Sequence, residues 1–380
     1  MTRQRILFLL GTRPEAIKLA PVIREVRSRT EGFDVCVCSS GQHREMLSQA
    51  LEPFDIRPDI QFDAMASAHS LGRLTGRLFK DVDRLLETEA PDWLIVQGDT
   101  TSAMVGAVCA FYRRIKVGHV EAGLRTDNRW SPFPEEINRT FIGHVADMHF
   151  APTKRAAQNL RKAGVDESAI CITGNTVVDA LQLVIALNQQ QAPLDLTLEL
   201  GGLINGGRLV LATSHRRESF GLGLENICQA LLRTAETYED VLIVYPVHLN
   251  PKVKEPVHRL LGRHPRIKLI SPVGYQQLVW LMQRSYCILT DSGGIQEEAP
   301  ALGKPVLVMR DTTERPEAIE AGCARLVGTN VNQILAGVRD LFENPAIYEA
   351  MAQVQNPFGD GLASQRIAEL LEGKKVAPWA

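Results

Sequence analysis

Polar residues that could carry acid–base chemistry stand where short apolar runs of the chain end. In the first half these are Asp99 and Glu121, followed by Glu135 at the start of a helical pattern. Clustered carboxylates raise one another's pKa, and a raised pKa makes a carboxyl group a usable proton donor or base near neutral pH. If one sheet edge collects these three acids, they indicate acid–base catalysis.

Each of these acids also has an ordinary structural interpretation. Asp99 could cap the helix that follows it, and Glu121 could pair with Arg125. Glu135 and its neighbour Glu136 could simply favour the positive end of a helix. For any single acid the structural interpretation is the commoner one, whereas all three at strand ends together favour chemistry.

Phosphate-binding features are spread over both halves of the sequence. The stretch LTDSGGIQEEAP breaks from an apolar run into Ser292-Gly293-Gly294 and resumes as a helix. Such a turn aims backbone N–H groups and a helix dipole at one point, which suits an anion, although a plain strand-to-helix connection looks the same. Near the N-terminus, Arg13 and Lys18 could clamp a diphosphate or could be solvated charges on a capped helix.

Histidine is the remaining candidate for proton transfer. His215 stands beside Arg216 and Arg217 after an apolar run, and these cations favour a neutral imidazole that acts as a hydrogen-bond partner or proton shuttle. His248 and His43 occupy similar positions at the ends of runs.

Several familiar cofactor motifs are absent from the sequence. No G-x-G-x-x-G fingerprint, Walker loop, H-E-x-x-H pair, Cys/His cluster or G-x-S-x-G elbow occurs. We therefore expect neither a nicotinamide cofactor nor an essential metal. The seven cysteines form no C-x-x-C pair and mostly lie inside apolar runs, which is typical of buried thiols in a reducing cytoplasm.

Length and charge narrow the class of protein. A chain of 380 residues predicts about two domains. A net charge of −2 supplies no basic field for nucleic acid or an anionic membrane. The first apolar run is too short for a signal peptide, so a cytoplasmic location is expected.

Apolar runs alternate with longer helical patterns in two series, which predicts two parallel sheets with both faces covered. The series separate at residues 185–207, which contain no expected strand, so we predict domains at 1–185 and 186–360. Ligands of such sheets lie beyond the carboxyl ends of the strands, here in a cleft between the two domains. The expected strands are 5–10, 33–40, 92–99, 115–120, 148–153, 169–175, 208–215, 239–247, 266–273, 286–292, 304–311 and 323–329. Amphipathic helices are expected at 332–352 and 363–373.

A series of longer motifs resembles, in order, that of the bacterial non-hydrolysing UDP-N-acetylglucosamine 2-epimerases. The motifs are GTRPEAIKLAP, GQHREML, GDTTSA, GHVEAGLRT, SPFPEEINR, GNTVVDAL, HRRESFG, YPVHLNP, LTDSGGIQEEAP and GKPVLVMRDTTERPEA. The resemblance implies the GT-B architecture, with two Rossmann-like domains, a deep cleft and a C-terminal helix, 361–380, that crosses back to the first domain. It also implies a homodimer and the interconversion of UDP-N-acetylglucosamine and UDP-N-acetylmannosamine for cell-surface polysaccharide.

The resemblance further implies roles for individual residues. The acid–base set would be Asp99, Glu121 and Glu135, with His215 near the leaving phosphate. The UDP-sugar ligands would be Arg13, Lys18, Ser292, Gly293, Gly294, Glu297 and Arg315. A second, activating UDP-N-acetylglucosamine would be held by Gln42, His43, Arg73, Glu136, Arg216 and His248. Ser214, in place of an expected glycine, departs from the family pattern.

Other activities of related proteins stay open. A hydrolysing epimerase that releases N-acetylmannosamine and UDP would use nearly the same residues, as would an epimerase of a UDP-2,3-diacetamido sugar. A GT-B glycosyltransferase or a nucleotide-sugar binding protein would leave the three carboxylates unexplained.

Overall fold

The computed structural model describes residues 3–41, 44–62, 70–204 and 207–379. The chain divides into two compact units, each of which is described by itself. Unit 1 combines Met1–Leu183 with Phe358–Ala380, and unit 2 is Val184–Pro357.

Unit 1 is built on a parallel sheet with the strand order β3-β2-β1-β4-β5-β6-β7. The interior strand β1 is buried from Ile6 to Leu10, because helices cover both faces and leave no polar side to the sheet. The strands are β1 (Gln4–Leu10), β2 (Phe33–Ser39), β3 (Ile60–Gln61), β4 (Trp93–Gln97), β5 (Lys116–Val120), β6 (Met148–Ala151) and β7 (Ile170–Ile172).

The helices of unit 1 connect these parallel strands. Helix α4 packs closely on the sheet at Gly106, where a Cβ would lie 2.6 Å from Cδ2 of Leu9. The elements are α1 (Arg13–Ser28), α2 (Arg44–Leu51), α3 (Leu71–Glu89), α4 (Thr101–Tyr112), α5 (Glu135–Val145), α6 (Lys154–Lys162) and α7 (Thr176–Gln190), which continues into unit 2, with the 3₁₀ helices η1 (Glu52–Phe54) and η2 (Glu167–Ala169).

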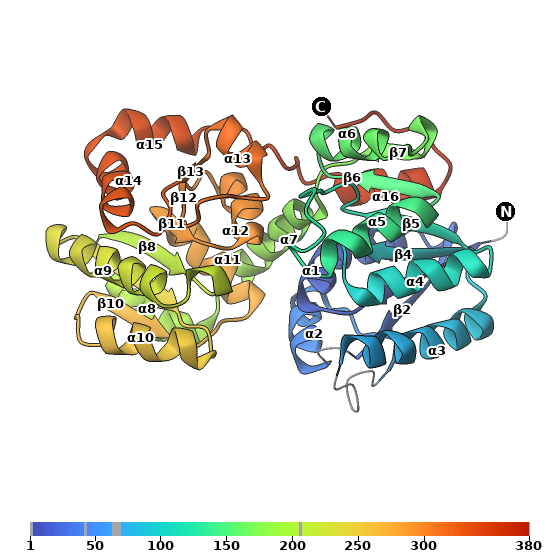
Figure 1. Cartoon of the computed structure of the whole chain (residues 1–380), viewed down its shortest axis with the longest axis horizontal. Helices are drawn as coiled ribbons and strands as arrows, with labels where there is room; N and C mark the ends of the chain where they lie inside the picture. The colour runs from blue at the N-terminus through green and yellow to red at the C-terminus, as the bar shows by residue number, and fades with distance from the viewer. Residues whose placement is uncertain (1–2, 42–43, 63–69, 205–206, 380) are drawn as a thin grey trace. The chain divides into compact units, whose positions relative to one another are not determined.

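Unit 2 repeats the plan with a parallel sheet of order β10-β9-β8-β11-β12-β13 (Figure 1). Its strands are β8 (Arg208–Thr213), β9 (Val241–Pro246), β10 (Ile267–Ile270), β11 (Cys287–Thr290), β12 (Val306–Val308) and β13 (Ala324–Leu326). Its helices are α8 (Leu194–Ile204), α9 (Leu222–Thr237), α10 (Pro251–Leu261), α11 (Tyr275–Arg284), α12 (Gly293–Glu298), α13 (Pro316–Ala321), α14 (Val331–Glu343) and α15 (Pro345–Ala352), with η3 (Arg217–Ser219) and η4 (Ala299–Leu302).

The last helix, α16 (Ala363–Leu371), belongs to unit 1, although the chain enters it from unit 2 (Figure 1). It packs against α1, and an ion pair of 2.7 Å between Arg29 and Glu372 fastens its end. Asp179 accepts hydrogen bonds from the backbone N–H groups of Ala363 and Ser364 at its start.

The predicted fold class, two Rossmann-like α/β domains of the GT-B type, is confirmed. Every expected strand is present, and among residues 3–41, 44–62, 70–204 and 207–379 the two-residue β3 is the one strand that the sequence did not predict. The expected helix at 332–352 was wrong in its continuity. It breaks into α14 and α15 because Pro345 has no N–H to continue the ladder, while the Asn344 side chain caps the new helix. Within the described part of the chain, no helix has the length and apolarity needed to cross a bilayer.

Both sheets have a switch point, where the strand order reverses and the loops diverge to opposite faces. In unit 1 it lies between β1 and β4, and in unit 2 it lies between β8 and β11. Ligands of doubly wound sheets bind at the carboxyl ends of strands beside such a point. The switch points are therefore where a site is expected.

Candidate active site

Asp99 and Glu121 follow two strands that are hydrogen-bonded neighbours. Gln97 at the end of β4 pairs with Val120 at the end of β5, and the N–H of Gly98 donates to the Val120 carbonyl at 3.0 Å. The two acids thus leave the sheet at the same edge, as the sequence predicted. Asp99 does not cap α4, because the Thr100 hydroxyl accepts from the N–H of Ala103 instead.

Glu121 is buried and surrounded by hydrogen-bond donors. Its Oε1 contacts the Lys18 ammonium and accepts from Nδ2 of Asn175 at 3.3 Å. Its Oε2 accepts from the Gln97 side-chain amide. Glu121 therefore forms a buried ion pair with Lys18.

The backbone of Glu121 adopts φ = 62°, in the left-handed region. A residue with a Cβ pays of order 1 kcal/mol for this conformation, which the surrounding contacts must offset. The conformation and the three donors together hold this carboxylate in one place.

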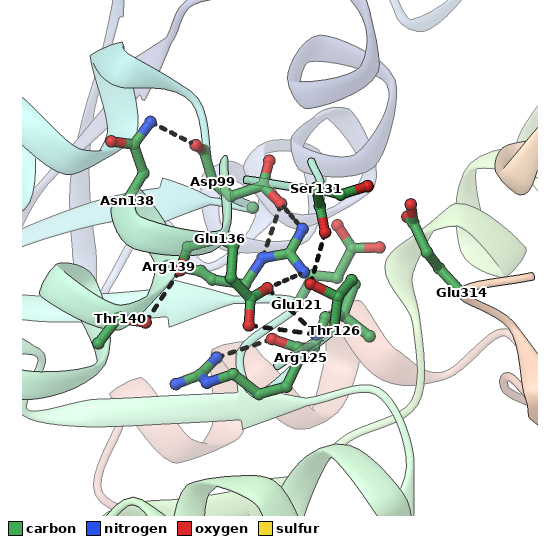
Figure 2. A network of polar contacts seen from close by, with 12 residues as sticks. Asp99, Glu121, Arg125, Thr126, Ser131, Glu136, Asn138, Arg139, Thr140 and Glu314 are labelled. Atoms are coloured by element: carbon green, nitrogen blue, oxygen red, sulfur yellow. Dashed lines mark hydrogen bonds and ion pairs between the residues drawn. The ribbon is translucent and has the colours of Figure 1, made fainter. Parts of the chain in front are cut away.

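Asp99 is held by an arginine that the sequence argument did not use. Nε of Arg139 donates to Asp99 Oδ2 at 3.1 Å, and Nη2 contacts the same oxygen. Nη1 donates to Glu136 at 3.1 Å, so one buried guanidinium joins the two acids (Figure 2). In addition, Asn138 donates to the Asp99 carbonyl at 2.9 Å.

Glu135 and Glu136 open α5 but differ in their environment. Glu136 is buried, and it accepts from the N–H of Thr126 at 3.1 Å (Figure 2). It also accepts from the N–H of Asp127 at 3.1 Å. Glu135 is partly exposed and lies one helical turn before Arg139, which binds Asp99. Glu136 therefore stabilises the backbone at residues 126 and 127, whereas the Glu135 side chain is accessible to solvent.

Glu15 joins the two strands at the unit 1 switch point. Its Oε2 accepts from the N–H of Thr12 at 2.6 Å, the Thr12 hydroxyl at 2.8 Å and the N–H of Gly11 at 3.2 Å. Its Oε1 accepts from the hydroxyl of Thr100, after β4, at 2.8 Å. Burial raises the pKa of Glu15 to about 7, although these hydrogen bonds act in the opposite direction.

His119, in β5, connects that strand to the residue that follows β4. Burial lowers its pKa to about 3, so the ring is neutral, and Nε2 lies 2.7 Å from the carbonyl oxygen of Gly98. Since a carbonyl only accepts, Nε2 carries the proton. The contact fixes Gly98, which has φ = 68° and directly precedes Asp99.

In unit 2 two guanidinium groups approach the predicted diphosphate turn. A Cβ built on Gly293 would lie 3.8 Å from Nη2 of Arg216 and 3.9 Å from Cζ of Arg315. Ser292 stands at the N-cap of α12, and its N–H donates to Thr290 at 2.9 Å. The two guanidinium groups are both positive and lie beside the N-terminus of a helix, so an anion bound there would be attracted by both.

Glu297 and Arg315 form an ion pair in the structure. Nε of Arg315 contacts Oε1 of Glu297, and the Glu297 side chain is buried. The position of Gly294 is next to Glu298, whose Oε2 would lie 3.7 Å from a Cβ at that glycine. The ribose role of Glu297 stays a prediction.

His215 faces a carboxylate as well as the neighbouring arginines. Its Nδ1 lies 3.2 Å from Oδ1 of Asp291, and its ring stacks on His248 with centroids 5.9 Å apart. His248 in turn accepts from the N–H of Asn250 at 3.1 Å. Burial lowers the pKa of His248, and the neighbouring His215 acts in the same direction.

Four other residues were predicted from the sequence as ligands of the nucleotide sugar. Arg13 begins α1 and is partly exposed, whereas Arg73 is exposed in the first turn of α3. Gln42 and His43 lie outside the residues that the structure describes.

Several polar residues at these sites were not singled out from the sequence, among them the ionisable residues Glu15, His119, Arg139 and Asp291. Each lies inside a motif quoted above, so its position was visible, but its partner comes from another strand or loop. Glu15 carried the clearest local signal, because an acid three residues after Thr12 at a helix start is a capping box.

Comparison with known proteins gives one consistent family. A family model described as UDP-N-acetylglucosamine 2-epimerase matches residues 24–372. The chain is 48% identical over 375 residues to the UDP-N-acetylglucosamine 2-epimerase of Escherichia coli K12, which covers 98% of this chain and 100% of that protein.

Solved structures agree with the sequence comparison. The UDP-GlcNAc 2-epimerase of Neisseria meningitidis, crystallised bound to UDP-GlcNAc, has a TM-score of 0.92 and 42% identity, covering 97% of this chain and 100% of that one. The Methanocaldococcus jannaschii enzyme in complex with UDP-GlcNAc and UDP has a TM-score of 0.80 and 32% identity, covering 97% and 99%. The chain therefore belongs to the UDP-N-acetylglucosamine 2-epimerase family.

Proposed function

We propose that this protein is a non-hydrolysing epimerase that interconverts UDP-N-acetylglucosamine and UDP-N-acetylmannosamine at carbon 2 of the sugar. The observation that carries the proposal is the pair of carboxylates, Asp99 and Glu121, that leave the neighbouring strands β4 and β5 beside the unit 1 switch point. Relatives that were crystallised with UDP-GlcNAc and with UDP support the choice of substrate.

The chemistry requires a base and a stabilised leaving group. The proton on carbon 2 has no adjacent carbonyl to acidify it, so we propose elimination. A carboxylate takes that proton, the C2–H electrons form the C1=C2 double bond, and UDP leaves with the electrons of the C1–O bond. UDP then adds back to carbon 1 of 2-acetamidoglucal while a proton reaches carbon 2 from the opposite face.

Unit 1 supplies the acid–base groups in this proposal. Asp99, Glu121 and Glu135 form the set, and we assign no order of proton transfers among them. Lys18, predicted above as a diphosphate ligand, contacts Glu121. We therefore propose that Lys18 acts on Glu121 and that Arg13 is the diphosphate ligand on α1.

Unit 2 supplies the nucleotide-binding groups. Ser292, Gly293 and Gly294 would receive the diphosphate, with Arg216 and Arg315 beside them. Positive charge at that point stabilises the oxygen that gains charge as UDP departs, which lowers the barrier as well as strengthening binding. Glu297 would bind the ribose hydroxyls and His215 would act next to the departing phosphate.

The proposed reaction requires no redox cofactor. Elimination and re-addition leave the oxidation state of the sugar unchanged, so we propose that neither a nicotinamide nor an essential metal takes part. A homodimer, a cytoplasmic location and activation by a second UDP-N-acetylglucosamine stay predictions from the resemblance. Light scattering and the dependence of rate on substrate concentration test the first and the last.

Proton NMR in heavy water tests the proposed function. Purified protein is incubated with UDP-N-acetylglucosamine without nicotinamide or added metal. We expect a UDP-linked manno product and deuterium at carbon 2 of both epimers. Free N-acetylmannosamine as the main product would instead identify a hydrolase, and no exchange at carbon 2 would contradict epimerisation.

A further inference from the structure

Asp291 lies at the unit 2 switch point and has no role in the function proposed above. It follows β11 directly, and β11 pairs with β8 so that Thr290 lies opposite Thr213. His215 is two residues beyond Thr213, so the aspartate and the histidine leave neighbouring strands at the same edge. The Asp291 side chain is 0% exposed.

The two oxygens of Asp291 do different things. Oδ2 accepts three hydrogen bonds from the loop after β8: from the Ser214 hydroxyl at 2.9 Å and from the N–H groups of His215 and Arg216 at 2.8 Å each. Oδ1 lies 3.2 Å from Nδ1 of His215. Within the described part of the chain no group donates a hydrogen bond of ordinary geometry to this buried oxygen, and Nδ1 of His215 is the nitrogen that faces it.

Asp291 is ionised although it is buried. Burial by itself raises the pKa of its carboxyl group. The contact with His215 and the two backbone N–H groups lower the pKa by more than burial raises it, so the net pKa is below its ordinary value. An ionised carboxylate only accepts hydrogen bonds. The nitrogen that faces it, Nδ1, must therefore be the one that carries a proton.

This arrangement decides what the other ring nitrogen can do. Nε2 lies on the opposite side of the imidazole, away from Asp291, and the His215 side chain is 41% exposed. With the proton held on Nδ1, a neutral ring presents Nε2 as an acceptor, and a protonated ring presents it as the donor. The His248 ring stacks on the imidazole, with an angle of 19° between the two ring planes.

We propose that Asp291 is a positioning residue that holds His215 as the Nδ1–H tautomer and thereby presents Nε2 to the diphosphate of the bound nucleotide. The presentation to diphosphate rests on the proposed function, whereas the tautomer does not. The alternative is that Asp291 only fastens the 214–216 loop through Oδ2.

The substitution Asp291→Asn separates these two roles. The amide oxygen can take the place of Oδ2 and keep the three hydrogen bonds, whereas the amide NH₂ then faces Nδ1 as a donor. This forces the proton of a neutral ring onto Nε2. Inverting the tautomer of an active-site histidine costs about 10³-fold or more in turnover while the fold is kept.

Ser214→Ala is the matched control. It removes one of the three hydrogen bonds to Oδ2 and leaves Oδ1 and the tautomer unchanged. We expect epimerase turnover of Ser214→Ala within about threefold of wild type, since the N–H groups of His215 and Arg216 still bind Oδ2 and the tautomer is unchanged. For Asp291→Asn we expect UDP to bind within about fivefold of wild type, because the loop is retained, while turnover falls.

Nitrogen-15 NMR of histidine-labelled full-length protein reads the tautomer directly. It is recorded at a pH where the ring is neutral, and His215→Gln identifies the signal. We expect the proton on Nδ1 in wild type and on Nε2 in Asp291→Asn. A wild-type Nε2–H tautomer, or one that Asp291→Asn leaves unchanged, overturns the proposal.

Equal losses of turnover and of melting temperature in Asp291→Asn and Ser214→Ala also overturn the proposal. They would show that Asp291 only stabilises the 214–216 loop. The tautomer measurement needs no substrate. A failure of the epimerase proposal, seen as absent epimerisation by wild type, is therefore distinguishable from a failure of this one.

Discussion

Each unit carries a buried carboxylate that bridges the two strands at its switch point, and the two carboxylates differ in their partners. Glu15 connects the turn after β1 to Thr100 after β4. Asp291, after β11, connects to the loop after β8. In Glu15 two of the four donors are hydroxyl groups, whereas Asp291 faces an imidazole as well as backbone N–H groups.

The partners decide the charge of each bridge. The pKa of Glu15 is raised to about 7, because burial outweighs its hydrogen bonds. The pKa of Asp291 is lowered, because His215 and the backbone amides outweigh burial. Equal burial therefore gives opposite outcomes, and the chemistry of the partner is what distinguishes them.

The charged side chains around the two buried carboxylates also differ between the units. Near the unit 1 switch point, carboxylates after β4 and β5 are paired with buried cations, Glu121 with Lys18 and Asp99 with Arg139. In unit 2 two guanidinium groups, those of Arg216 and Arg315, lie beside one glycine turn. We infer that unit 1 is arranged for proton transfer and unit 2 for an anion, and the predictions below test that division.

The largest expected effect is that of Glu121→Gln. An amide of the same shape cannot take or give the proton, so turnover should fall about 10³-fold. UDP affinity, measured by calorimetry, should stay within about threefold, since the proposed UDP ligands are Arg13 and residues of unit 2, not Glu121. The control Glu89→Gln changes a peripheral acid that pairs with Arg5 and should leave turnover nearly unchanged. Loss of UDP binding in Glu121→Gln would contradict the division.

Glu15→Gln tests the bridge in unit 1 through stability. A folded-state pKa of about 7, above the ordinary 4.5, means that the folded protein binds this proton more tightly than the unfolded chain does. The resulting stabilisation is complete below about pH 4.5 and is lost as the pH rises through about 7. The free energy of unfolding of wild type relative to Glu15→Gln should therefore fall by about 3 kcal/mol between these limits.

Urea unfolding of both proteins between pH 5 and 8 measures most of that change. A difference between the two proteins that does not vary with pH would show that Glu15 is ionised throughout. The two bridges would then be alike in charge.

Lys18→Met distinguishes the two assignments of that lysine. Removing the cation leaves the buried Glu121 without its ion-pair partner, so turnover should fall about 10²-fold with UDP affinity nearly unchanged. A comparable loss of UDP affinity would instead show that Lys18 binds the diphosphate, as the sequence alone predicted. The division between the units would then be less sharp.

Arg216→Ala should have the smallest effect of the four. Removing one charge-assisted contact to a phosphate should weaken UDP binding about 20-fold. Arg217→Ala, at an exposed neighbouring position, is the control and should bind UDP as wild type does. Equal affinity in both variants would remove Arg216 from the anion site.

Much of the fold could be predicted because strands buried on both faces leave continuous apolar runs, as RILFLL does at β1. The two-residue β3 left no such run. The break between α14 and α15 was missed because amphipathic periodicity continues across Asn344, although Pro345 marked it.

The candidate site was predicted as residues rather than as contacts. Asp99, Glu121 and His215 were identifiable because each follows a strand. Their partners could not be identified, because Arg139 lies 40 residues from Asp99 and Asp291 lies 76 residues from His215. Local sequence does not show which loops converge, and only the strand order brings these pairs together.

In the proposed reaction the C1–O bond breaks while carboxylates of unit 1 move the carbon 2 proton and cations of unit 2 hold the departing UDP. UDP-N-acetylglucosamine that carries oxygen-18 in the bridge between carbon 1 and phosphorus shows whether that bond breaks. We predict that, as epimerisation proceeds, the label appears in the non-bridging oxygens of the β-phosphate. Epimerisation with all of the label retained in the bridge would contradict the account.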